Sequence, residues 1–561
     1  MKKPSLLLLL VAVCSMLSPN LLSASTTTFW TGAVDGDLGN SNNWSPITNP
    51  YTPPSDSDLI FSSSTNTNLT GILPIIYVSS LTFNANAPSY TFHVPYAQGF
   101  TIDGGGIVNN SGVTQTLSID AGNVTFNNSP TLTGATIAVN GSTSNNNYGA
   151  LYLFGTTSAG NSTIINNAGT IAGGGGGFTI IGNTTTLSNA TVINNGGVGQ
   201  NGYITINGSA GNATLIANGG ASTNQSGGVI DFQGGTGANA TITVNGGSGS
   251  NALAGGIAFQ YNSSAGSATV TLNGGTNGGA GAYALFENTA SGGTSKFVVN
   301  SHATLDISQV DYTNTVSFGS VEGAGTIDLG GRKIQIGSLN TSTSISGLIS
   351  DAGLGGQTGG SLEKIGSGTL NLLNNDTYTG GTIITAGALA VNGSIQGSTE
   401  VKNGATLKGT GTIYGTVTVD AGGTISPGNS PGTITMRSLI LTNTSILDFE
   451  LGTTSDKVVI TTSGGLTLAG ILNISDSGGF NTNAPYVLFN YTGPVTNNGL
   501  QIGTVPAGYL ASDFSFSLTN GQINFLYSPV PEPTTVVQFF LSAMLLVPLL
   551  LRRRIPLGRN A

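Results

Sequence analysis

Apolar and polar residues alternate along the middle of the chain in short runs that return at a nearly fixed interval. Equivalent threonines in successive copies lie 28, 23, 27 and 28 residues apart, at Thr163, Thr191, Thr214, Thr241 and Thr269. A second apolar run precedes each copy by about a dozen residues, as in LYLFG from Leu151, FTIIG from Phe178 and YITING from Tyr203. Alternation of this kind suits β-strands with one face inward. Each repeat is therefore predicted to contain two short strands.

A repeat of this length is typical of a solenoid, in which one unit buries its apolar face only by stacking on its neighbours. Asn-Gly and Gly-Gly recur at the bends, where we expect a positive φ. Such turns also suit antiparallel hairpins, so a sandwich or a barrel is the alternative. A period of about 27 residues with equivalent positions in register favours an all-β, right-handed parallel β-helix. Its Asn, Ser and Thr side chains would stack as ladders on the outer faces.

Composition changes this picture in two ways. The chain has 87 glycines in 561 residues, is 38% hydrophobic and only 7% charged, which fits neither a disordered chain nor an ordinary globular enzyme. Its net charge is −9. Six of its fourteen basic residues lie at the two ends, namely Lys2, Lys3, Arg552, Arg553, Arg554 and Arg559, so the body between them is still more acidic. The acidic body offers no basic patch for phosphates, so nucleic-acid binding is not expected.

Residues 1–24 have the pattern of a short helical signal peptide. Lys2 and Lys3 precede an apolar stretch that is too short for a membrane span, and Ala24 suits cleavage. The single cysteine, Cys14, lies inside this segment, and a lipoprotein is the alternative. Val13 stands where a small residue would be expected for acylation. Cleavage after Ala24 would leave a mature chain without disulfides or thiol chemistry.

Residues 25–100 are predicted to form an N-terminal cap, because an open solenoid exposes strand edges and core at its ends. This segment holds both tryptophans, Trp30 and Trp44, and several prolines. The tryptophans suit core packing, with stacking on sugar rings as the alternative. Asp35, Asp37 and Asn40 suggest a calcium loop, but no closing Glu follows, so a solvated turn is favoured.

Residues 101–300 are predicted to form the Gly/Asn-rich β-helix repeats of about 27 residues. After them the repeat pattern changes. The segment Leu362–Ile395 resembles the autotransporter-associated β-strand repeat of passenger β-helices. The resemblance rests on Gly366, Gly368, Thr369, Leu370, Leu372, Asn375, Thr377, Tyr378, Thr379, Gly380, Gly381, Thr382, Ala386, Gly387, Leu389, Val391, Asn392 and Gly393. It implies two strands around a Gly-Gly bend that Tyr378 covers, and residues 301–528 are expected to continue such a region.

Residues 529–561 depart from an autotransporter, which would end in an outer-membrane barrel. The order Val530, Pro531, Glu532, Pro533, then an apolar segment, then Arg552, Arg553 and Arg554 resembles the PEP-CTERM sorting signal. That resemblance implies processing by an exosortase-type protease in a Gram-negative bacterium that makes exopolysaccharide. The sixteen residues from Val536 to Leu551 would make a helix of roughly 24 Å, a marginal transmembrane segment with the arginines on the cytoplasmic side. A permanent tail anchor is the alternative.

Catalytic residues are sparse in this pattern. Acidic residues that lie close in sequence are Asp306 with Asp311 and Asp448 with Glu450, and the two histidines, His93 and His302, are far apart. The run LDFEL reads as an amphipathic strand with Leu447, Phe449 and Leu451 inward. No catalytic, cofactor or metal site is predicted.

The sequence thus predicts a secreted or cell-surface structural or adhesive rod, associated with extracellular polysaccharide or a biofilm matrix. At about 4.8 Å per coil, about four hundred residues would form a rod near 70 Å long. One alternative is a polysaccharide lyase or glycosidase on a β-helix, which would need paired carboxylates on one face. Another is a matrix filler with no specific ligand.

Overall fold

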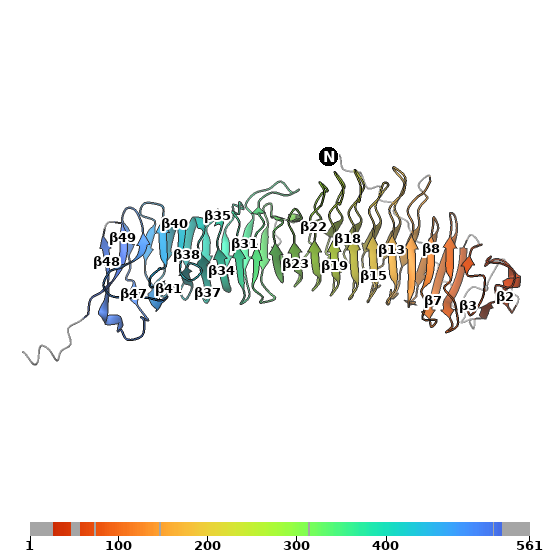
Figure 1. Cartoon of the computed structure of the whole chain (residues 1–561), viewed down its shortest axis with the longest axis horizontal. Coiled ribbons are helices and arrows are strands. Elements are labelled where there is room, and N and C mark those ends of the chain that lie inside the picture. Colours follow the sequence, from red (N-terminus) through yellow and green to blue (C-terminus); the bar gives the residue numbers. More distant parts are fainter. Residues whose placement is uncertain are drawn as a thin grey trace, which may run out of the picture.

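The computed structural model describes residues 26–46, 57–71, 75–128, 130–144, 147–311, 315–519 and 521–529. Within these ranges the chain is an all-β parallel solenoid of about 17 turns, drawn as a long rod in Figure 1. The same residues contain two short 3-10 helices, η1 (Ser41–Asn43) and η2 (Ala511–Asp513), and no α-helix. The predicted fold class is confirmed in this part of the chain, while the right-handed sense of winding stays a prediction.

Each turn of the solenoid adds one strand to each of its long sheets, so neighbours in a sheet come from successive coils. The first sheet has the order β2 (Trp44–Ser45), β1 (Thr27–Trp30), β3 (Ser57–Phe61), β5 (Ile75–Phe83), β7 (Gly99–Asn109), β9 (Asn123–Asn127), β12 (Ala150–Leu153), β14 (Phe178–Ile181), β16 (Tyr203–Ile206), β18 (Val229–Gln233), β20 (Gly256–Gln260), β22 (Tyr283–Asn288), β24 (Thr304–Val310), β27 (Thr326–Asp328) and β30 (Ile349–Ser350), with β10 (Thr131–Leu132) also beside β7.

The second sheet forms the next side of the coil and extends further along the rod. Its parallel strands follow one another as β4 (Asn68–Leu69), β6 (Thr91–Val94), β8 (Gln115–Ile119), β11 (Ala135–Val139), β13 (Thr163–Asn166), β15 (Thr191–Asn194), β17 (Thr214–Ala217), β19 (Thr241–Val244), β21 (Thr269–Leu272), β23 (Lys296–Val299), β26 (Ser320–Gly323), β29 (Thr343–Ile345), β32 (Thr369–Leu372), β34 (Gly387–Val391), β37 (Ala405–Gly409), β39 (Thr424–Pro427), β41 (Ile446–Leu451), β44 (Ile471–Asp476) and β47 (Gln501–Ile502).

The third side changes in width along the rod. In the first half it is a row of single-residue bridges through Thr131, Ser158, Thr186, Ser209, Thr236, Ser264 and Ser291. Beyond it a third sheet runs β25 (Thr315–Phe318), β28 (Lys333–Ile336), β31 (Ser361–Lys364), β33 (Thr382–Ile384), β36 (Thr399–Val401), β38 (Thr412–Val419), β40 (Thr433–Leu441), β42 (Lys457–Ile460), β45 (Tyr486–Asn490), β49 (Gln522–Tyr527) and β48 (Phe514–Thr519), with β35 (Ser394–Ile395), β43 (Leu466–Leu468) and β46 (Val495–Asn497) at its margin.

The register of the second sheet confirms the predicted stacking. The five equivalent threonines, Thr163, Thr191, Thr214, Thr241 and Thr269, pair directly with one another from coil to coil. In the first sheet Phe178 pairs with Tyr203, but Leu151 pairs with Thr179, so the apolar run that begins at Leu151 is offset by one residue. A sequence period of about 27 residues is therefore the length of one coil.

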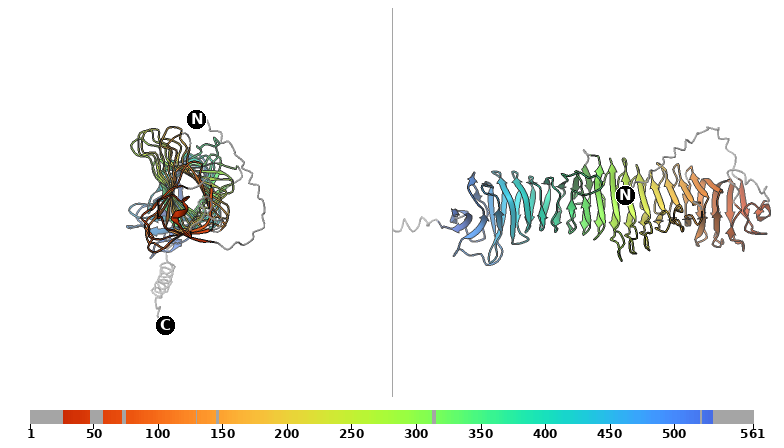
Figure 2. Two further views of the ribbon diagram at one scale, coloured as in Figure 1. Left: turned by 90° about the vertical axis from the view of Figure 1, so that its right-hand side faces the viewer. Right: turned by 90° about the horizontal axis from the view of Figure 1, so that it is seen from above.

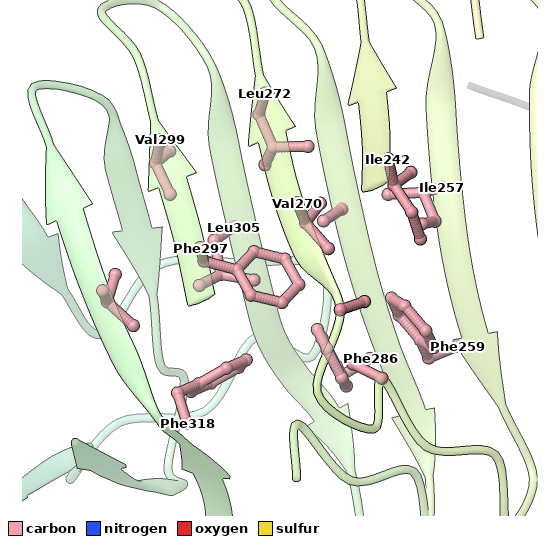
Figure 3. Close-up of a cluster of buried hydrophobic side chains, with 14 of the residues drawn as sticks. Ile242, Ile257, Phe259, Val270, Leu272, Phe286, Phe297, Val299, Leu305 and Phe318 are labelled. Carbon is pink, nitrogen blue, oxygen red and sulfur yellow. The ribbon is translucent and has the colours of Figure 1, made fainter. Parts of the chain in front are cut away.

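The core is a column of apolar side chains from facing sheets. Phe259 stacks on Phe232 with ring centroids 4.8 Å apart and on Phe286 at 4.7 Å, which is close to the strand spacing of about 4.8 Å. Figure 3 shows the column continuing to Phe297 and Phe318, which meet edge to face. Equivalent positions therefore form apolar stacks inside the rod.

Antiparallel strands close both ends of the rod. At the N-terminal end β1 pairs antiparallel with β2, and the rings of Trp30 and Trp44 meet at 5.0 Å, both buried. The tryptophans thus pack in the core, as favoured from sequence. At the C-terminal end the hairpin β48–β49 pairs with β45, and Phe514 stacks on Phe525 at 4.6 Å. These strands cover the core and the edges that an open solenoid would expose.

Glycine follows asparagine at the bends for a reason other than the predicted positive φ. Gly196, Gly219, Gly246 and Gly274 do not have positive φ. A Cβ on Gly219 would instead lie 2.2 Å from the Gly246 carbonyl oxygen, and one on Gly246 would lie 2.5 Å from the Gly274 carbonyl. The prediction of positive φ at these Asn-Gly pairs was wrong, because the glycines let the backbones of successive coils touch.

Both ends of the sequence lie outside the described residues. The predicted signal peptide, residues 1–24, and the sorting segment with Val530 to Pro533 and Arg552 to Arg554 therefore stay predictions. Among the described helices, none has the length and apolar character needed to cross a membrane. The predicted division at residues 100, 300 and 528 also stays a prediction.

Candidate functional site

Seven stacked asparagines form a continuous row of side-chain hydrogen bonds along one corner of the solenoid. In each link the Nδ2 group donates to the Oδ1 atom of the asparagine one coil earlier, at 2.8 to 2.9 Å. The members of this asparagine ladder are Asn140, Asn167, Asn195, Asn218, Asn245, Asn273 and Asn300. The polar side chains predicted to stack thus include this row of asparagines.

The ladder begins on a carboxylate. Asp120 accepts hydrogen bonds from Asn140 Nδ2 at 2.9 Å and from the Ser118 hydroxyl at 2.7 Å through the same oxygen. The other carboxylate oxygen lies 3.0 Å from Nδ1 of His93. His93 and Asp120, which the sequence left unconnected, thus form one hydrogen-bonded group at the first rung of the ladder.

Local structure explains why asparagine recurs at this corner. Each ladder residue stands next to the end of a second-sheet strand; Asn245, for example, follows Val244, the last residue of β19. The backbone then leaves the sheet in a loop, which places the amide at the corner directly over the amide of the previous coil. Its main chain keeps the ladder spacing, because Asn245 N donates to Ala217 O at 2.8 Å. Stacked amides satisfy one another in this geometry.

Glycine-rich loops follow the ladder and project from one corner of the end-on view in Figure 2. They rise above the strands between β8 and β22 in Figure 1. Neighbouring loops are tied by main-chain bonds, such as the pair between Gly197 and Ser226 at 3.0 and 2.8 Å. The loops are therefore an ordered wall beside the ladder rather than separate flaps.

Between the ladder and these loops lies a groove of about 810 Å³, which we call the amide groove. Asp120 lies at one end of it, and Asn140, Asn167 and Asn195 line it together with Val198. The amides of Asn167 and Asn195 each use one N–H and one oxygen lone pair within the row, which leaves a second donor and acceptor capacity, whereas Asn140 donates to both Ser118 and Asp120. The groove thus presents hydrogen-bonding groups at intervals of about 4.8 Å.

A second groove of about 500 Å³ lies on the outer face of the second sheet, further along the rod. Asn392 is its centre: its Nδ2 donates to Asn371 at 2.6 Å, and its Oδ1 accepts from Asn429 at 2.7 Å. Lys408 also lines this groove. Hydroxyl, amide and ammonium groups are its polar features, so it too is a surface for hydrogen bonding.

The aspartates of the N-terminal turn are held by the turn itself. Asp35 accepts from Asn43 Nδ2 at 2.6 Å and from Asp37 N at 3.0 Å, and Asp37 accepts from Gly39 N at 2.9 Å. The hydrogen bond from Asn43 is the main cause that lowers the pKa of Asp35. This geometry is that of a hydrogen-bonded turn, and no group of three or more His, Cys, Asp or Glu suited to a metal occurs among the described residues.

In the structure, the acidic residues that lie close in sequence are either held by hydrogen bonds or exposed to solvent. Asp306 is 4% exposed and accepts from the backbone N–H groups of Ser308 at 2.8 Å and Leu354 at 3.0 Å, which ties down a loop over the first sheet. Asp311 is exposed. Asp448 lies on the outer face of β41 and accepts from Asn473 at 2.9 Å. The predicted inward set, Leu447, Phe449 and Leu451, is buried, which confirms that strand assignment.

The repeat at Leu362–Ile395 buries several polar side chains, among them Lys364, Asp376 and Tyr378. Lys364 is 1% exposed, and its ammonium donates to the carbonyl oxygens of Ile365, Gly366 and Ala386 at 2.7, 2.8 and 3.1 Å. Burial lowers the pKa of Lys364 to about 8. Tyr378 is fully buried beside the Gly-Gly bend, and its hydroxyl lies 2.7 Å from that of Thr382.

Comparison with known proteins agrees with this geometry. Residues 362–391 match the model of the passenger-associated transport repeat. It is also 38% identical over 112 residues to "Adhesin BmaC autotransporter" of Brucella suis biovar 1 (strain 1330), an alignment that covers 18% of this chain and 3% of that protein. Together with the solenoid, these matches support a passenger-like β-helix.

The main features of the amide groove were not identified from sequence. The stacking of Asn, Ser and Thr was expected, but not which asparagines share a row, since Asn140 and Asn167 are separated by loops of variable length. The recurrence of Asn before Gly, at Asn195, Asn218, Asn245 and Asn273, was a usable signal. Nothing in the sequence connected Asp120 to that row.

Proposed function

We propose that this protein is a cell-surface adhesive rod that binds extracellular polysaccharide along the amide groove. The observation that carries this proposal is the asparagine ladder, because its regular donors and acceptors match the hydroxyl groups of a polymeric sugar. Similarity to an autotransporter adhesin over part of the chain supports an adhesive role. Many weak hydrogen bonds along an extended groove would add up in the manner of a multivalent contact.

A binding role fits the grooves better than hydrolysis or elimination. Asp120 is the one acidic residue that lines the amide groove in the described chain, and it is bonded to His93 and Asn140. Glycosidases use two carboxyl groups that flank the scissile bond. We therefore propose a non-catalytic protein rather than a polysaccharide lyase or glycosidase.

We further propose export by the N-terminal signal and sorting by an exosortase-type protease at Val530, Pro531, Glu532 and Pro533. The PEP-CTERM resemblance of that segment supports this, as does the order of an apolar stretch before Arg552, Arg553 and Arg554. Processing would release the rod to the surface or to the matrix of a Gram-negative bacterium. The repeat match at residues 362–391 is in keeping with such a location.

Binding in the amide groove is tested by filling it without changing the ladder. Val198 lines the groove and is 52% exposed, so Val198→Glu places a bulky anion there at little cost to folding. We expect at least a tenfold loss of affinity for the polysaccharide of the producing strain, measured by biolayer interferometry with the full-length protein. Val113→Glu, at a residue that is 43% exposed and does not line the amide groove, is the matched control.

Equal binding by both variants and the unmodified protein would overturn the groove assignment. Reducing ends or unsaturated sugars released during the same incubation would favour the enzyme alternative. Absence of binding between the unmodified protein and the polysaccharide of the producing strain would favour the filler alternative.

Sorting is tested separately by mass spectrometry of protein recovered from the membrane and the medium. With Pro531→Ala and Glu532→Ala together, we expect the unprocessed C-terminus to accumulate in the membrane fraction. A processed mass identical to that of the unmodified protein would show that this motif is not the signal.

A further inference from the structure

A third groove lies on the first sheet near the N-terminal end of the rod, around strands β5, β7 and β9. It has a volume of about 450 Å³, and we call it the tyrosine groove. Tyr77 of β5, Thr101 of β7 and Thr125 of β9 pair in register, so these three lining residues form one outward row across successive coils. β7 is labelled near that end of the rod in Figure 1.

Two aromatic side chains border this groove with much of their surface in solvent. Tyr77 is 51% exposed, and Tyr96, in the turn between β6 and β7, is 66% exposed. The neighbouring rings of Phe100 and Phe126, by contrast, are at most 2% exposed and belong to the core, whereas further along the first sheet single exposed rings occur at Phe154, Tyr261 and Tyr283. Tyrosine offers a rigid apolar ring with a polar tip at a low cost in conformational entropy. A pair of such rings at one groove is a ready-made surface for a flat ligand.

The groove also contains a polar atom without a partner. Gln98 lines it, and the side-chain oxygen Oε1 of Gln98 is buried and makes no hydrogen bond in the described structure. A buried acceptor left unpaired costs about 1 to 3 kcal/mol, so such an atom gains from a ligand that brings a donor. Because this oxygen is closed off from solvent, the Gln98 side chain must turn toward the groove before a hydroxyl group held between the tyrosines can supply that donor.

The floor of the groove is shaped by main-chain contacts that exclude larger side chains. A Cβ on Gly122 would lie 2.5 Å from the Gln98 carbonyl oxygen and 2.7 Å from that of Pro95. Asn123 N donates to the same Gln98 carbonyl at 3.0 Å, which fixes the two turns together. The groove is therefore set by the stacked backbone and is formed before any ligand arrives.

The residues that line the groove point to an uncharged ligand. All of them are neutral, and their polar side chains are those of Tyr77, Tyr96, Gln98, Thr101, Asn123 and Thr125. A pyranose ring combines an apolar C–H face, which packs on an aromatic ring, with a rim of hydroxyl donors. Apolar walls with few convergent polar groups are the usual composition of a small-molecule site.

From this arrangement we propose that the tyrosine groove binds one neutral pyranose residue, with its C–H face on Tyr77 or Tyr96 and a hydroxyl donating to Gln98 Oε1. The proposal rests on the proposed polysaccharide-binding function and names a discrete sugar subsite for it. The two grooves adjoin in the chain, because Asp120 lines the amide groove while Ala121 and Gly122 line the tyrosine groove.

The test uses the full-length protein and neutral oligosaccharides of glucose, galactose and mannose, with affinities from titration calorimetry and ligand contacts from saturation-transfer NMR. Tyr77→Ala and Tyr96→Ala are each expected to weaken binding of the best oligosaccharide at least tenfold. Tyr77→Phe keeps the ring and is expected to bind within twofold of the unmodified protein. Gln98→Met, which keeps length and removes the acceptor, is expected to lose about fivefold. Tyr414→Ala, at a tyrosine that is 52% exposed on β38, is the matched control.

Wild-type affinity in both Tyr77→Ala and Tyr96→Ala would overturn the subsite. If Val198→Glu abolished binding while these two variants bound normally, the proposed function would stand and the tyrosine groove would be excluded. If the tyrosine variants lost binding and Val198→Glu kept it, the sugar subsite would stand without the amide groove. Absence of binding to all three oligosaccharide series would overturn the subsite, whatever the result with the strain's own polysaccharide.

Discussion

At the scale of the residue, the backbone of the coils directly above and below limits which side chain fits at each position in this rod. Glycine serves two separate purposes. Gly246 has no positive φ, yet a Cβ there would meet the next coil at 2.5 Å, whereas Gly211 has φ +61°. At the turn that contains Gly211, two other coils have a non-glycine residue with positive φ, namely Ser188 at 51° and Ala238 at 45°. A residue with a Cβ in this region costs roughly 1 to 2 kcal/mol.

This turn allows a paired test of backbone strain. Ala238→Gly is expected to stabilise the protein by about 1 kcal/mol, because glycine adopts positive φ without steric penalty. Gly211→Ala is expected to destabilise it, since the new Cβ would lie 2.9 Å from the main-chain nitrogen and oxygen of Ser188. Denaturant unfolding, with hydrogen exchange at β17 and β19, measures both effects. A stabilising Gly211→Ala would contradict this account of the turn.

Buried carboxyl groups give a second prediction at this scale. Asp376 is 1% exposed, one of its oxygens accepts from Ile349 N at 2.9 Å, and the other is buried without a partner. Burial raises the pKa of Asp376 to about 7. The protonated form therefore contributes stability that is fully present below the unfolded pKa of about 4 and is lost as the pH rises through about 7.

Replacing this group should consequently change the pH dependence of stability. The free energy of unfolding of Asp376→Asn minus that of the unmodified protein is expected to increase between pH 4 and pH 8, by up to about 4 kcal/mol. Urea unfolding at each pH measures it, with the exposed Asp448→Asn as the control for loss of one charge. A difference that is the same at pH 4 and pH 8 would show that Asp376 does not titrate in this range.

At the scale of the element, hydrogen-bonded rows of side chains join strands that the backbone already pairs. Asn218 donates to Asn195 and accepts from Asn245, both at 2.9 Å, so it is bonded on two sides. The exposed row at the neighbouring turn is weaker, because Asn212 donates to Asn189 at 3.4 Å. A side chain paired on both sides and half-buried contributes more than one with a long, solvated contact.

The asparagine ladder can therefore be tested at its middle. Asn218→Ala is expected to lower the free energy of unfolding by about 1 to 3 kcal/mol, because it removes two hydrogen bonds and leaves the partners unpaired. Asn218→Asp is expected to cost at least as much, since a carboxylate accepts from Asn245 but has no N–H to donate to Asn195. Asn189→Ala, in the exposed row, is the control, and a cost equal to that of Asn218→Ala would mean that the ladder adds nothing beyond the strands.

The extent to which sequence predicted these elements depended on whether a feature was local. Alternation of apolar residues and the spacing of Thr163, Thr191 and Thr214 gave the strands and their register, because equivalent positions stack at one per coil. The reason for Gly246 and the pairing of Asp120 with Asn140 were not predicted, because both are contacts between coils at loops of unequal length.

At the scale of the whole molecule, the rod is a one-dimensional stack in which each coil contacts its neighbours. The C-terminal hairpin was not recognised from sequence, although the alternating run FSFSLTNGQINFLY contains Asn-Gly, a strong signal for a hairpin turn. Its apolar alternation resembles that of the coils, so the pattern alone does not separate it from the repeat region. In the structure its antiparallel pairing to β45 marks it as the end of the stack.

Local stability of this cap follows from the same arrangement. Phe525 is 1% exposed and stacks on Phe514, so Phe525→Ala is expected to cost about 3 to 5 kcal/mol within the cap. Because contacts are between neighbours, hydrogen exchange should increase at β45, β48 and β49 and stay slow at β13 to β21. Leu518→Ala, 42% exposed on β48, is the control. Loss of protection along the entire rod would show that the coils unfold together.

The carboxylate at the first rung has one more effect. Asp120 can only accept from Asn140, so Asn140 must turn its amino group toward it, and each later amide is then oriented the same way. The C=O and N–H dipoles of seven side chains thus point in a single sense along the rod and reinforce one another. Because a sugar polymer has two unlike ends, a polysaccharide bound as proposed would have different affinities for this corner in its two orientations, head toward Asp120 or head away.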